Sequence, residues 1–459
     1  MILPTLAAPH PSDLAGLRDA VAGTVIAPGD PEYDDARQVH YADVDRRPAL
    51  IVRPASAGEV SRVVARATGL ELAVRSGGHG GGGHGTSEGG IVIDLRDLRS
   101  MEIDVGGRTA WAGAGLTAGE YTARAGEHGL ATGFGDTGSV GIGGITLGGG
   151  IGYLVRSHGL TIDDLLAAEI VTADGGLLHV DEESHPDLFW AIRGGGGNFG
   201  VVTRFRFRLH ELATVVGGTL ILPATPDVVA GFVAAAEAAP DALSTIAAVM
   251  KAPPMPLIPE AHHGRPIVFA LMFHAGAPSE AAAALAPFRA LAAPLADEVR
   301  EVPYPQLFAP GEEHRPLAVY RGVFPDRLGA AEAAAILEHL ERSTATMAVV
   351  QLRVLGGAMA RVPADATAFA HRGRGLLAFA AAVYEDPATA AEHAAWVDGL
   401  VAALHPGEPD EYVNFLGTVG PERVRRAYPG STWDRLREVK RRYDPHNLFR
   451  LNHNVPPAP

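Results

Sequence analysis

The feature that most constrains this chain is a run of glycines around one histidine, RSGGHGGGGHGTSEGG, at residues 75–90. The apolar stretches ELAVR and GIVIDL flank the run, so the pattern predicts a loop between two strands. Glycine has no Cβ and tolerates positive φ, which lets backbone N–H groups converge on an anion. The segment lacks the Lys and Ser/Thr of a Walker loop and does not open a helix. It therefore predicts a phosphate cradle of another kind, with His79 as its unusual member.

Two other interpretations of this loop are weaker. A glycine-rich loop without a ligand is common, but nine glycines among these sixteen residues cost chain entropy that a bound ligand would offset. A metal site at His79 and His84 is disfavoured because their five-residue spacing is not a helical pair and no thiolate can complete the set. We therefore predict a ligand-binding loop and no metal.

Composition excludes several classes of protein. With 459 residues the chain has room for two or three domains. Its net charge of −15 disfavours nucleic acid and anionic membranes as partners. There is no cysteine, which excludes disulfides, thiolate metal sites and a thioether link to a cofactor. The N-terminal residues show neither a signal peptide nor an apolar span, so we expect a cytoplasmic protein.

Three further glycine-rich segments need separate interpretations. Residues 133–160 are rich in glycine yet apolar, which indicates close backbone approach rather than a flexible linker. GAGLTAG at 113–119 matches a dinucleotide fingerprint only in part and lacks the later acidic residue, so it predicts a tight junction between strand and helix. RGGGGNFG at 193–200 has more glycines than a helix C-cap requires, which favours contact with a cofactor or another loop.

The order of elements predicts an α+β chain. In the first half, short strands alternate with helices that begin at capping-box patterns at 56–59 and 117–120. Asp174-Gly175 predicts a primed turn within a hairpin. Residues 203, 205, 207 and 209 are expected to share one face of a strand.

The composition changes near residue 212, where alanine and proline become frequent. Long apolar strands then alternate with helices expected near 226–239, 278–293 and 328–343. This pattern predicts an antiparallel sheet with helices on one face. Near residue 409 the chain changes again, to a helix over 431–443 and a short tail.

Several of these segments together resemble one protein family. RSGGH, GSVGIGGITLGGGIGYLVRSHGLTIDDL, DLFWAIRGGGGNFGVV and KRRYDPHNLFRLNHNVPP stand in the order found in the berberine bridge enzyme-like flavoproteins of the vanillyl-alcohol oxidase and p-cresol methylhydroxylase-type superfamily, and the likeness is greatest to the bacterial branch. The resemblance covers nearly the whole chain. It implies a two-part FAD-binding domain of the p-cresol methylhydroxylase type at 1–211 and 409–459. A substrate-binding domain with an antiparallel sheet covered by helices is inserted at 212–408.

The resemblance also implies how the cofactor is held. In the family the loop that matches RSGGH wraps the FAD pyrophosphate, and its histidine, here His79, bonds covalently to the flavin. Many members add a second bond from a cysteine; Thr137 stands at that position here, so a single link is expected. The other cofactor-binding residues expected from these motifs are Arg75, Ser76, Gly77, Gly78, Gly80, Gly83, His84, Gly138, Val140, Gly141, Gly143, Gly144, Gly149, Tyr153, Ile170, Val171, Asn452 and Asn454.

The implied reaction removes a hydride from a C–H bond next to an O–H or N–H of a small sugar, alcohol, amine or natural-product intermediate. Val140 stands at the family's oxygen gate, and its small side chain resembles the oxidase form. This implies O2 as electron acceptor and H2O2 as product. A dehydrogenase with a quinone-like acceptor and a flavin-holding protein without turnover are the alternatives. The oligomeric state has no signal in the sequence.

By the same resemblance, two strands face the substrate. QLRVLGG would present Gln351 and Arg353 on one face, and YVNF, read as a strand, would present Tyr412 and Asn414. The acidic base of the plant enzyme aligns with Ala378, so that enzyme's mechanism is not expected.

We expect Tyr412 instead to take part in proton removal, with Asn414 orienting the ligand. A tyrosine with a pKa near 10 is a weak base at neutral pH, and Arg353 is the expected cation that lowers it. His262 or His263 would be the next candidates.

Overall fold

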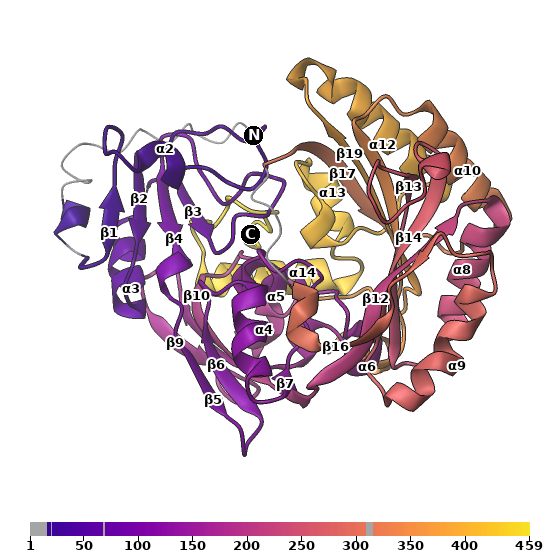
Figure 1. The fold of residues 1–459 in the computed structure, drawn as a ribbon. Coiled ribbons are helices and arrows are strands. Elements are labelled where there is room, and N and C mark those ends of the chain that lie inside the picture. The colour runs from indigo at the N-terminus through magenta and orange to yellow at the C-terminus, as the bar shows by residue number, and fades with distance from the viewer. Residues whose placement is uncertain (1–15, 20, 68, 309–314) are drawn as a thin grey trace.

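The computed structural model describes residues 16–19, 21–67, 69–308 and 315–459. Its elements form two parts that lie side by side (Figure 1). One part contains the first half of the chain and the C-terminal segment, and the other is a long sheet with helices on its outer side.

Two small sheets and the two-stranded pair of β7 and β11 form the first part. The first has the strand order β1-β2-β4-β3 and joins β2, β4 and β3 in parallel, and the second has the order β5-β6-β10-β8-β9 and is antiparallel. Their strands are β1 (Thr24–Ile26), β2 (Leu50–Arg53), β3 (Leu72–Arg75), β4 (Ile91–Asp94), β5 (Met101–Asp104), β6 (Thr109–Gly113), β8 (Leu165–Val171), β9 (Leu177–Val180) and β10 (Val201–Arg208). The connecting elements are α2 (Tyr33–Ala36), α3 (Ala57–Arg66), α4 (Ala118–Gly126), β7 (Leu130–Ala131), α5 (Ile142–Gly148), α6 (Val155–His158), α7 (Pro186–Ile192) and β11 (His210–Glu211).

Helix starts in this part follow the local sequence. The Thr117 hydroxyl accepts a hydrogen bond from the Glu120 N–H, and the Glu120 carboxylate accepts one from the Thr117 N–H, which closes the capping box of α4. At α3, Ser56 accepts from the Glu59 N–H, but the Glu59 carboxylate accepts from backbone N–H groups outside the helix. The capping box of α3 is therefore incomplete, and the Glu59 carboxylate instead connects the helix to the N-terminal segment by hydrogen bonds.

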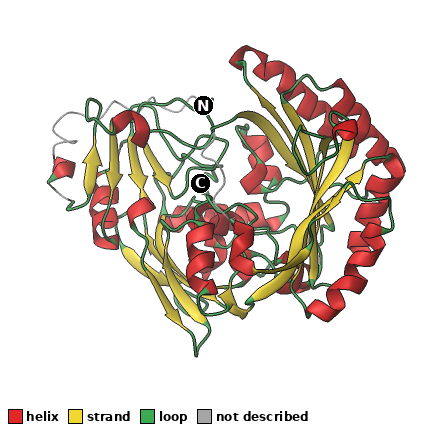
Figure 2. Ribbon diagram, viewed as in Figure 1, coloured by secondary structure: helices red, strands yellow, loops and turns green. Residues whose placement is uncertain are grey.

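The second part is an antiparallel eight-stranded sheet with the order β15-β12-β14-β13-β18-β19-β17, to which β16 adds beside β12. Its strands are β12 (Thr214–Pro223), β13 (Leu243–Lys251), β14 (Pro266–His274), β15 (Ala296–Asp297), β16 (Arg300–Pro303), β17 (Leu317–Val323), β18 (Met347–Val354) and β19 (Leu376–Tyr384). The helices α8 (Pro226–Ala238), α9 (Pro278–Arg289), α10 (Ala330–Arg342) and α12 (Ala390–Leu404) cover one face (Figure 2). Buried apolar residues of the sheet and of these helices form one core, as the sequence pattern predicts.

The C-terminal segment returns to the first part. It contains the 3-10 turn η6 (Val413–Phe415) and the helices α13 (Pro421–Arg426) and α14 (Ser431–Tyr443). Leu436 and Val455 share a hydrophobic core with Leu188 and Phe199. A short helix, α11 (Ala358–Arg361), follows β18. Among the described residues, no helix is long and apolar enough to cross a bilayer.

Two local predictions are wrong. YVNF is not a strand: Tyr412 precedes η6, and the Phe415 N–H donates to the Tyr412 carbonyl at 2.8 Å, so an i+3 bond closes a turn. The loop at Asp174-Gly175 is not a primed two-residue turn, since it spans 172–176 and only Gly175 has positive φ there, +81°. Asp174 stabilises it by accepting from the Gly176 N–H at 3.0 Å.

Candidate functional site

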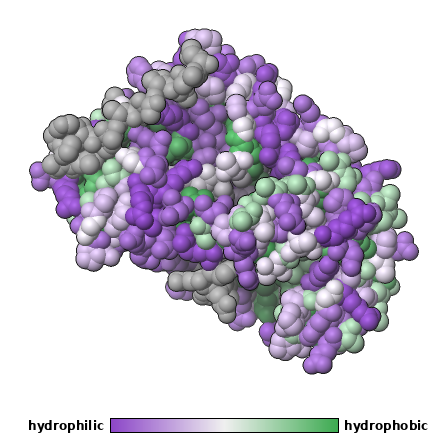
Figure 3. All heavy atoms as spheres, turned by 90° about the horizontal axis from the view of Figure 1, so that it is seen from above, coloured by the Kyte–Doolittle hydropathy of each residue, from purple (hydrophilic) through white to green (hydrophobic). Residues whose placement is uncertain are grey.

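A cavity of about 470 Å³ lies where the two parts of the molecule meet. We call the side formed by residues from three glycine-rich segments, 75–85, 135–144 and 196–200, the glycine wall. The sheet wall consists of Tyr320 on β17, Gln351 and Arg353 on β18, Phe379 on β19, and Tyr412 to Phe415. The view from above in Figure 3 shows apolar side chains in hollows between more hydrophilic surroundings. A cavity of this size is typical of a small-molecule site.

His79 lies on the glycine wall beside a second histidine. Its ring stacks on that of His40, with centroids 4.0 Å apart and planes 20° from parallel. The backbone N–H of His40 donates to the carbonyl of Gly78 at 3.1 Å, which ties the two segments together. Burial lowers the pKa of His79 to about 4, and His40 adds to that shift. The His79 imidazole is therefore neutral at physiological pH, with one ring nitrogen carrying a free lone pair.

Arg75 supports the glycine wall from inside the protein. Its guanidinium forms an ion pair with Asp94 at 2.8 Å and donates to the backbone carbonyls of Ala36 and Gln38. Its side chain is only 2 % exposed. The charge of Arg75 is thus used to hold the strand end in place, so the wall presents mainly backbone to the cavity.

Two contrasting groups stand out among the glycines of this wall. Gly77 and Gly141 pack against each other, and a Cβ on either would come within 2.2 Å of the other's backbone nitrogen. Gly80, Gly144 and Gly197 line the cavity, and a Cβ there would meet nothing within 4 Å. Packing inside the protein explains the first group. At the positions of the second group the cavity has free space, which is room for a ligand.

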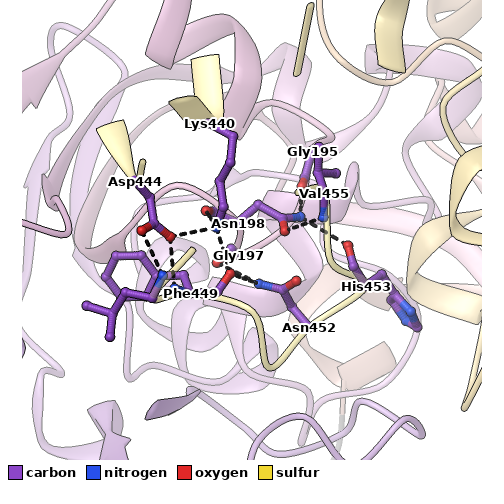
Figure 4. A network of polar contacts seen from close by, with 10 residues as sticks. Gly195, Gly197, Asn198, Lys440, Asp444, Phe449, Asn452, His453 and Val455 are labelled. Atoms are coloured by element: carbon purple, nitrogen blue, oxygen red, sulfur yellow. Dashed lines mark hydrogen bonds and ion pairs between the residues drawn. The ribbon is translucent and has the colours of Figure 1, made fainter. Parts of the chain in front are cut away.

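A buried polar network fixes the end of the glycine wall to the C-terminal tail (Figure 4). Lys440 donates to the carbonyls of Asn198 and Phe449 at 2.6 and 2.8 Å, and pairs with Asp444 at 2.6 Å. The Asn198 amide donates to the carbonyls of Gly195 and His453 and accepts from the Val455 N–H. The network joins residues about 250 positions apart and leaves the tail against the cavity.

Asn452 gives this network an open acceptor. Its amide nitrogen donates to the carbonyls of Gly197 and Phe449. Within the described ranges, its Oδ1 atom and that of Asn454 are buried without a hydrogen-bond partner. Asn452 lines the cavity, and a buried acceptor left unpaired is costly, which is a sign of a missing donor on a bound ligand.

Tyr412 and Asn414 act as a pair on the sheet wall. The Tyr412 hydroxyl oxygen accepts from the Gly150 N–H and from the Asn414 amide, both at 2.9 Å. A second Asn414 amide hydrogen donates to the Ile145 carbonyl at 3.2 Å. Burial raises the pKa of Tyr412 to about 12, although these donors act in the opposite direction. The donors surround the oxygen and would stabilise a phenolate once the proton leaves.

Arg353 points its charge at a carboxylate from the other wall. It pairs with Asp136 at 2.7 Å and donates to the Gln351 side-chain oxygen at 2.7 Å. Arg353 acts to lower the pKa of Tyr412, the direction expected from the sequence, but burial raises that pKa by more. The alignment that puts the plant base at Ala378 is also not supported, since that side chain packs in the helix-covered core, whereas Phe379 faces the cavity.

The structure brings most of the sequence-predicted residues to one place. Those that line the cavity are Arg75, Ser76, Gly78, His79, Gly80, His84, Thr137, Val140, Gly141, Gly143, Gly144, Gln351, Arg353, Tyr412, Asn414 and Asn452. Those that are not among its lining residues are Gly77, Gly83, Gly138, Gly149, Tyr153, Ile170, Val171 and Asn454. Tyr153, for example, stacks on Phe273 at 5.4 Å. His262 and His263 belong to a loop of the second part and are not among the described lining residues.

Other lining residues were missed by the sequence analysis: His40, Tyr41, Asp136, Asn198, Tyr320, Phe379, Phe415 and His453. Asp136 could have been noticed as the one carboxylate within the glycine-rich segment 133–160. Tyr320 and Phe379 carry no sequence signal, because each lies in an ordinary apolar strand, and the aromatic residues become neighbours only in the fold.

Two family models and a relative of known name match this chain. Residues 48–181 match the FAD binding domain model, and residues 411–456 match the model described as berberine and berberine like. The chain is 32% identical over 463 aligned positions to (R)-6-hydroxynicotine oxidase of Paenarthrobacter nicotinovorans, covering 95% of this chain and 97% of the relative.

Solved structures of oxidases have a similar fold. The crystal structure of 6-hydroxy-D-nicotine oxidase from Arthrobacter nicotinovorans superposes with a TM-score of 0.83 at 28% identity, covering all of both chains. Xylooligosaccharide oxidase from Myceliophthora thermophila gives a TM-score of 0.85 at 24% identity over 97% of this chain and all of the other, which shows a shared fold.

Proposed function

This chain belongs to the berberine bridge enzyme-like family of FAD-linked oxidoreductases, and from that premise we propose that it is an oxidase with O2 as its electron acceptor. It acts on a small molecule that carries a C–H bond next to an O–H or N–H. The observation that carries the proposed acceptor is the small side chain of Val140 in the cavity lining, and the neutral imidazole of His79 beside the open glycine positions supports the flavin itself. A dehydrogenase with a quinone-like acceptor is the alternative. A protein that holds flavin without turnover is disfavoured, because the relatives are named as oxidases and oxidoreductases.

The residues of the cavity fit an FAD molecule. Gly80, Gly144 and Gly197 offer backbone surface without side chains in the way, which suits close approach of phosphates and of a flat ring. The unpaired Oδ1 of Asn452 can accept a hydrogen bond from a hydroxyl. The absence of cysteine restricts covalent attachment to other nucleophiles.

We propose that His79 holds the flavin covalently and that this is the only link. A nucleophilic imidazole must be unprotonated, and burial keeps His79 so. The stack on His40 limits rotation of the ring. Thr137 is exposed and its hydroxyl donates to Asp136 at 3.1 Å; a neutral hydroxyl is a weak nucleophile, so a second bond is not expected there.

When bound, FAD supplies an acceptor for the hydride and passes the electrons on. The chain's own residues then have to remove the proton and position the donor. Tyr412 is the proposed proton acceptor, in its phenolate form, with the Gly150 N–H and the Asn414 amide positioned to stabilise the phenolate before it takes the substrate proton. Asn414 also fixes the orientation of the tyrosine. The Arg353–Asp136 pair offers one donor and one acceptor group to the substrate side.

Peroxide formation tests the proposed acceptor. The purified enzyme is reduced anaerobically in a screen of alcohols, sugars and cyclic amines, and the reduced enzyme is mixed with air-saturated buffer. We expect rapid return of the oxidised flavin spectrum with one H2O2 per flavin. Slow reoxidation by O2 together with fast reoxidation by a soluble quinone would establish the dehydrogenase instead.

Acid precipitation tests the covalent link. The wild-type pellet should stay yellow, and a tryptic peptide that contains His79 should gain the mass of FAD. In His79→Ala the colour should move to the supernatant while the folded protein still binds FAD, because the glycine wall is intact. Release of all flavin from the wild-type protein by acid would contradict the link.

A further inference from the structure

A continuous row of aromatic rings lines the cavity, from Tyr41 near the N-terminus to Tyr320, Phe379 and Phe415 on the sheet wall. Ring centroids lie 5.5 Å apart between Tyr41 and Tyr320, 5.2 Å between Tyr320 and Phe379, and 4.6 Å between Phe379 and Phe415. Phe379 and Phe415 are both partly exposed, and both line the cavity. Their free faces are therefore available to a ligand.

The hydroxyl groups among these residues already have partners in the protein. The Tyr320 hydroxyl accepts from the Gly81 N–H at 2.9 Å and shares a hydrogen bond with Tyr41. Tyr412 and Asn414 bond to each other. A ligand with many hydroxyl groups would have to break such bonds in order to form its own, and that exchange brings little net gain.

Arg353 adds a donor that has no partner of this kind. Arg353 pairs through Nη2 with Asp136 and Gln351, but its Nε is buried and has no hydrogen-bond partner in the part of the chain that the structure describes. The side chain is 7 % exposed and its guanidinium lies 5.5 Å from the centroid of the Phe415 ring. The wall thus combines flat apolar surface with one concentrated polar position.

We propose that the substrate is a flat aromatic or conjugated compound with a single oxygen substituent near its reacting carbon, rather than an oligosaccharide. Its ring packs against Phe379 and Phe415, where offset or edge contacts between aromatic rings are favourable. Its oxygen is directed to Arg353, whose guanidinium donates to it, with Asp136 available if the oxygen carries a hydrogen. This inference rests on the proposed function and narrows its substrate class.

Binding of unreactive probes tests the substrate class without requiring turnover. The holoenzyme is titrated with 2-naphthol and, separately, with cellobiose, and the visible flavin spectrum is recorded. We expect 2-naphthol to perturb the spectrum at submillimolar concentration and cellobiose to leave it unchanged at a hundredfold higher concentration. Phe379→Ala should weaken 2-naphthol binding at least tenfold, and Phe379→Tyr, which keeps the ring, less than threefold. Arg353→Met should weaken it about tenfold.

Three results would overturn the proposal: cellobiose binding as well as 2-naphthol, no spectral change with either probe, or equal 2-naphthol affinity in Phe379→Ala and the wild type. Flavin content and photoreduction followed by reoxidation in air are measured on each variant. An enzyme that is photoreduced and reoxidised normally but binds neither probe retains the proposed oxidase function and loses only the substrate class. An enzyme without bound flavin would contradict both.

Discussion

The glycine wall and the sheet wall enclose the same cavity, but the first does so mainly with backbone and the second with side chains. The glycine wall offers mainly backbone: the charge of Arg75 is turned into the protein, and Lys440 on α14 holds the loop at Asn198, so that Asp136 is the charged side chain this wall gives to the cavity. The sheet wall offers side chains: the rings of Phe379 and Phe415, the Arg353 guanidinium, which pairs with Asp136 of the glycine wall, and the Tyr412 hydroxyl. A backbone surface is suited to close approach of a cofactor, whereas side chains are suited to selecting a substrate. Substitutions on the two walls should therefore affect different properties.

The largest effect is expected on the sheet wall, from Tyr412→Phe. Loss of a positioned base should slow flavin reduction by about 10²–10⁴, while flavin content stays at the wild-type level. Because the deprotonated form is active and burial raises the pKa of Tyr412 to about 12, the wild-type rate should rise with pH through the measurable range, and the variant should lose this rise. Stopped-flow reduction across pH 6–10 measures both.

Tyr304→Phe is the matched control for that experiment. Tyr304 is fully buried, and its hydroxyl has no hydrogen-bond partner in the described structure. It should therefore keep the wild-type rate and pH profile. A rate within a factor of two of wild type in Tyr412→Phe would remove Tyr412 from the mechanism.

The support of the glycine wall should respond in stability instead. Lys440→Met leaves Asp444 buried without its partner, and such a change costs about 3–5 kcal/mol. The midpoint of urea unfolding should fall accordingly, and flavin should be lost before the chain unfolds, because the loop at Asn198 is released. Arg442→Met removes a largely exposed pair with Asp187 and should cost less than about 1 kcal/mol. Equal effects of the two changes would mean that the buried network does not hold the wall.

The two walls also differ in how well the sequence predicts them. The residues of the glycine wall form short continuous sequence motifs, because the geometry of the wall requires glycine at particular positions such as Gly77 and Gly141. The long sheet with its helices is also confirmed, since its alternation of long strands and helices is strong. By contrast, Arg353 and Asp136 are 217 positions apart, and no local pattern joins them.

YVNF shows how a wrong element can still bring the expected residues together. The strand interpretation failed because the segment closes an i+3 turn. Tyr412 and Asn414 nevertheless meet, because in that turn the Asn414 amide reaches the Tyr412 hydroxyl at 2.9 Å. Their proximity was predicted, but the backbone that produces it was not.

A smaller and opposite pair of effects is expected at Gly144 on α5. A Cβ there meets no protein atom within 4 Å, and alanine in a helix is favoured over glycine by about 0.5–1 kcal/mol. Gly144→Ala should therefore leave the unfolding midpoint equal or higher while it lowers flavin incorporation about tenfold, because the methyl group enters the cavity. Gly373→Ala, at an exposed position outside the described cavity lining, should change neither. Full flavin content in Gly144→Ala would show that this glycine does not face the cofactor.

The smallest effect is expected at Val140, whose proposed role does not fit the division between the two walls. It lies on the glycine wall and lines the cavity, yet its proposed role concerns oxygen and not the cofactor. Val140→Leu adds one methylene where O2 is proposed to approach, so reoxidation of the reduced enzyme should slow several-fold to about tenfold, about 1 kcal/mol in the barrier. Reduction by substrate should stay within a factor of two, since Val140 has no group that exchanges protons. Val140→Ala should keep or raise the oxygen rate. If Leu slows reduction and reoxidation equally, the methylene disturbs the flavin itself, and Val140 belongs with the glycines as a cofactor contact rather than as a gate.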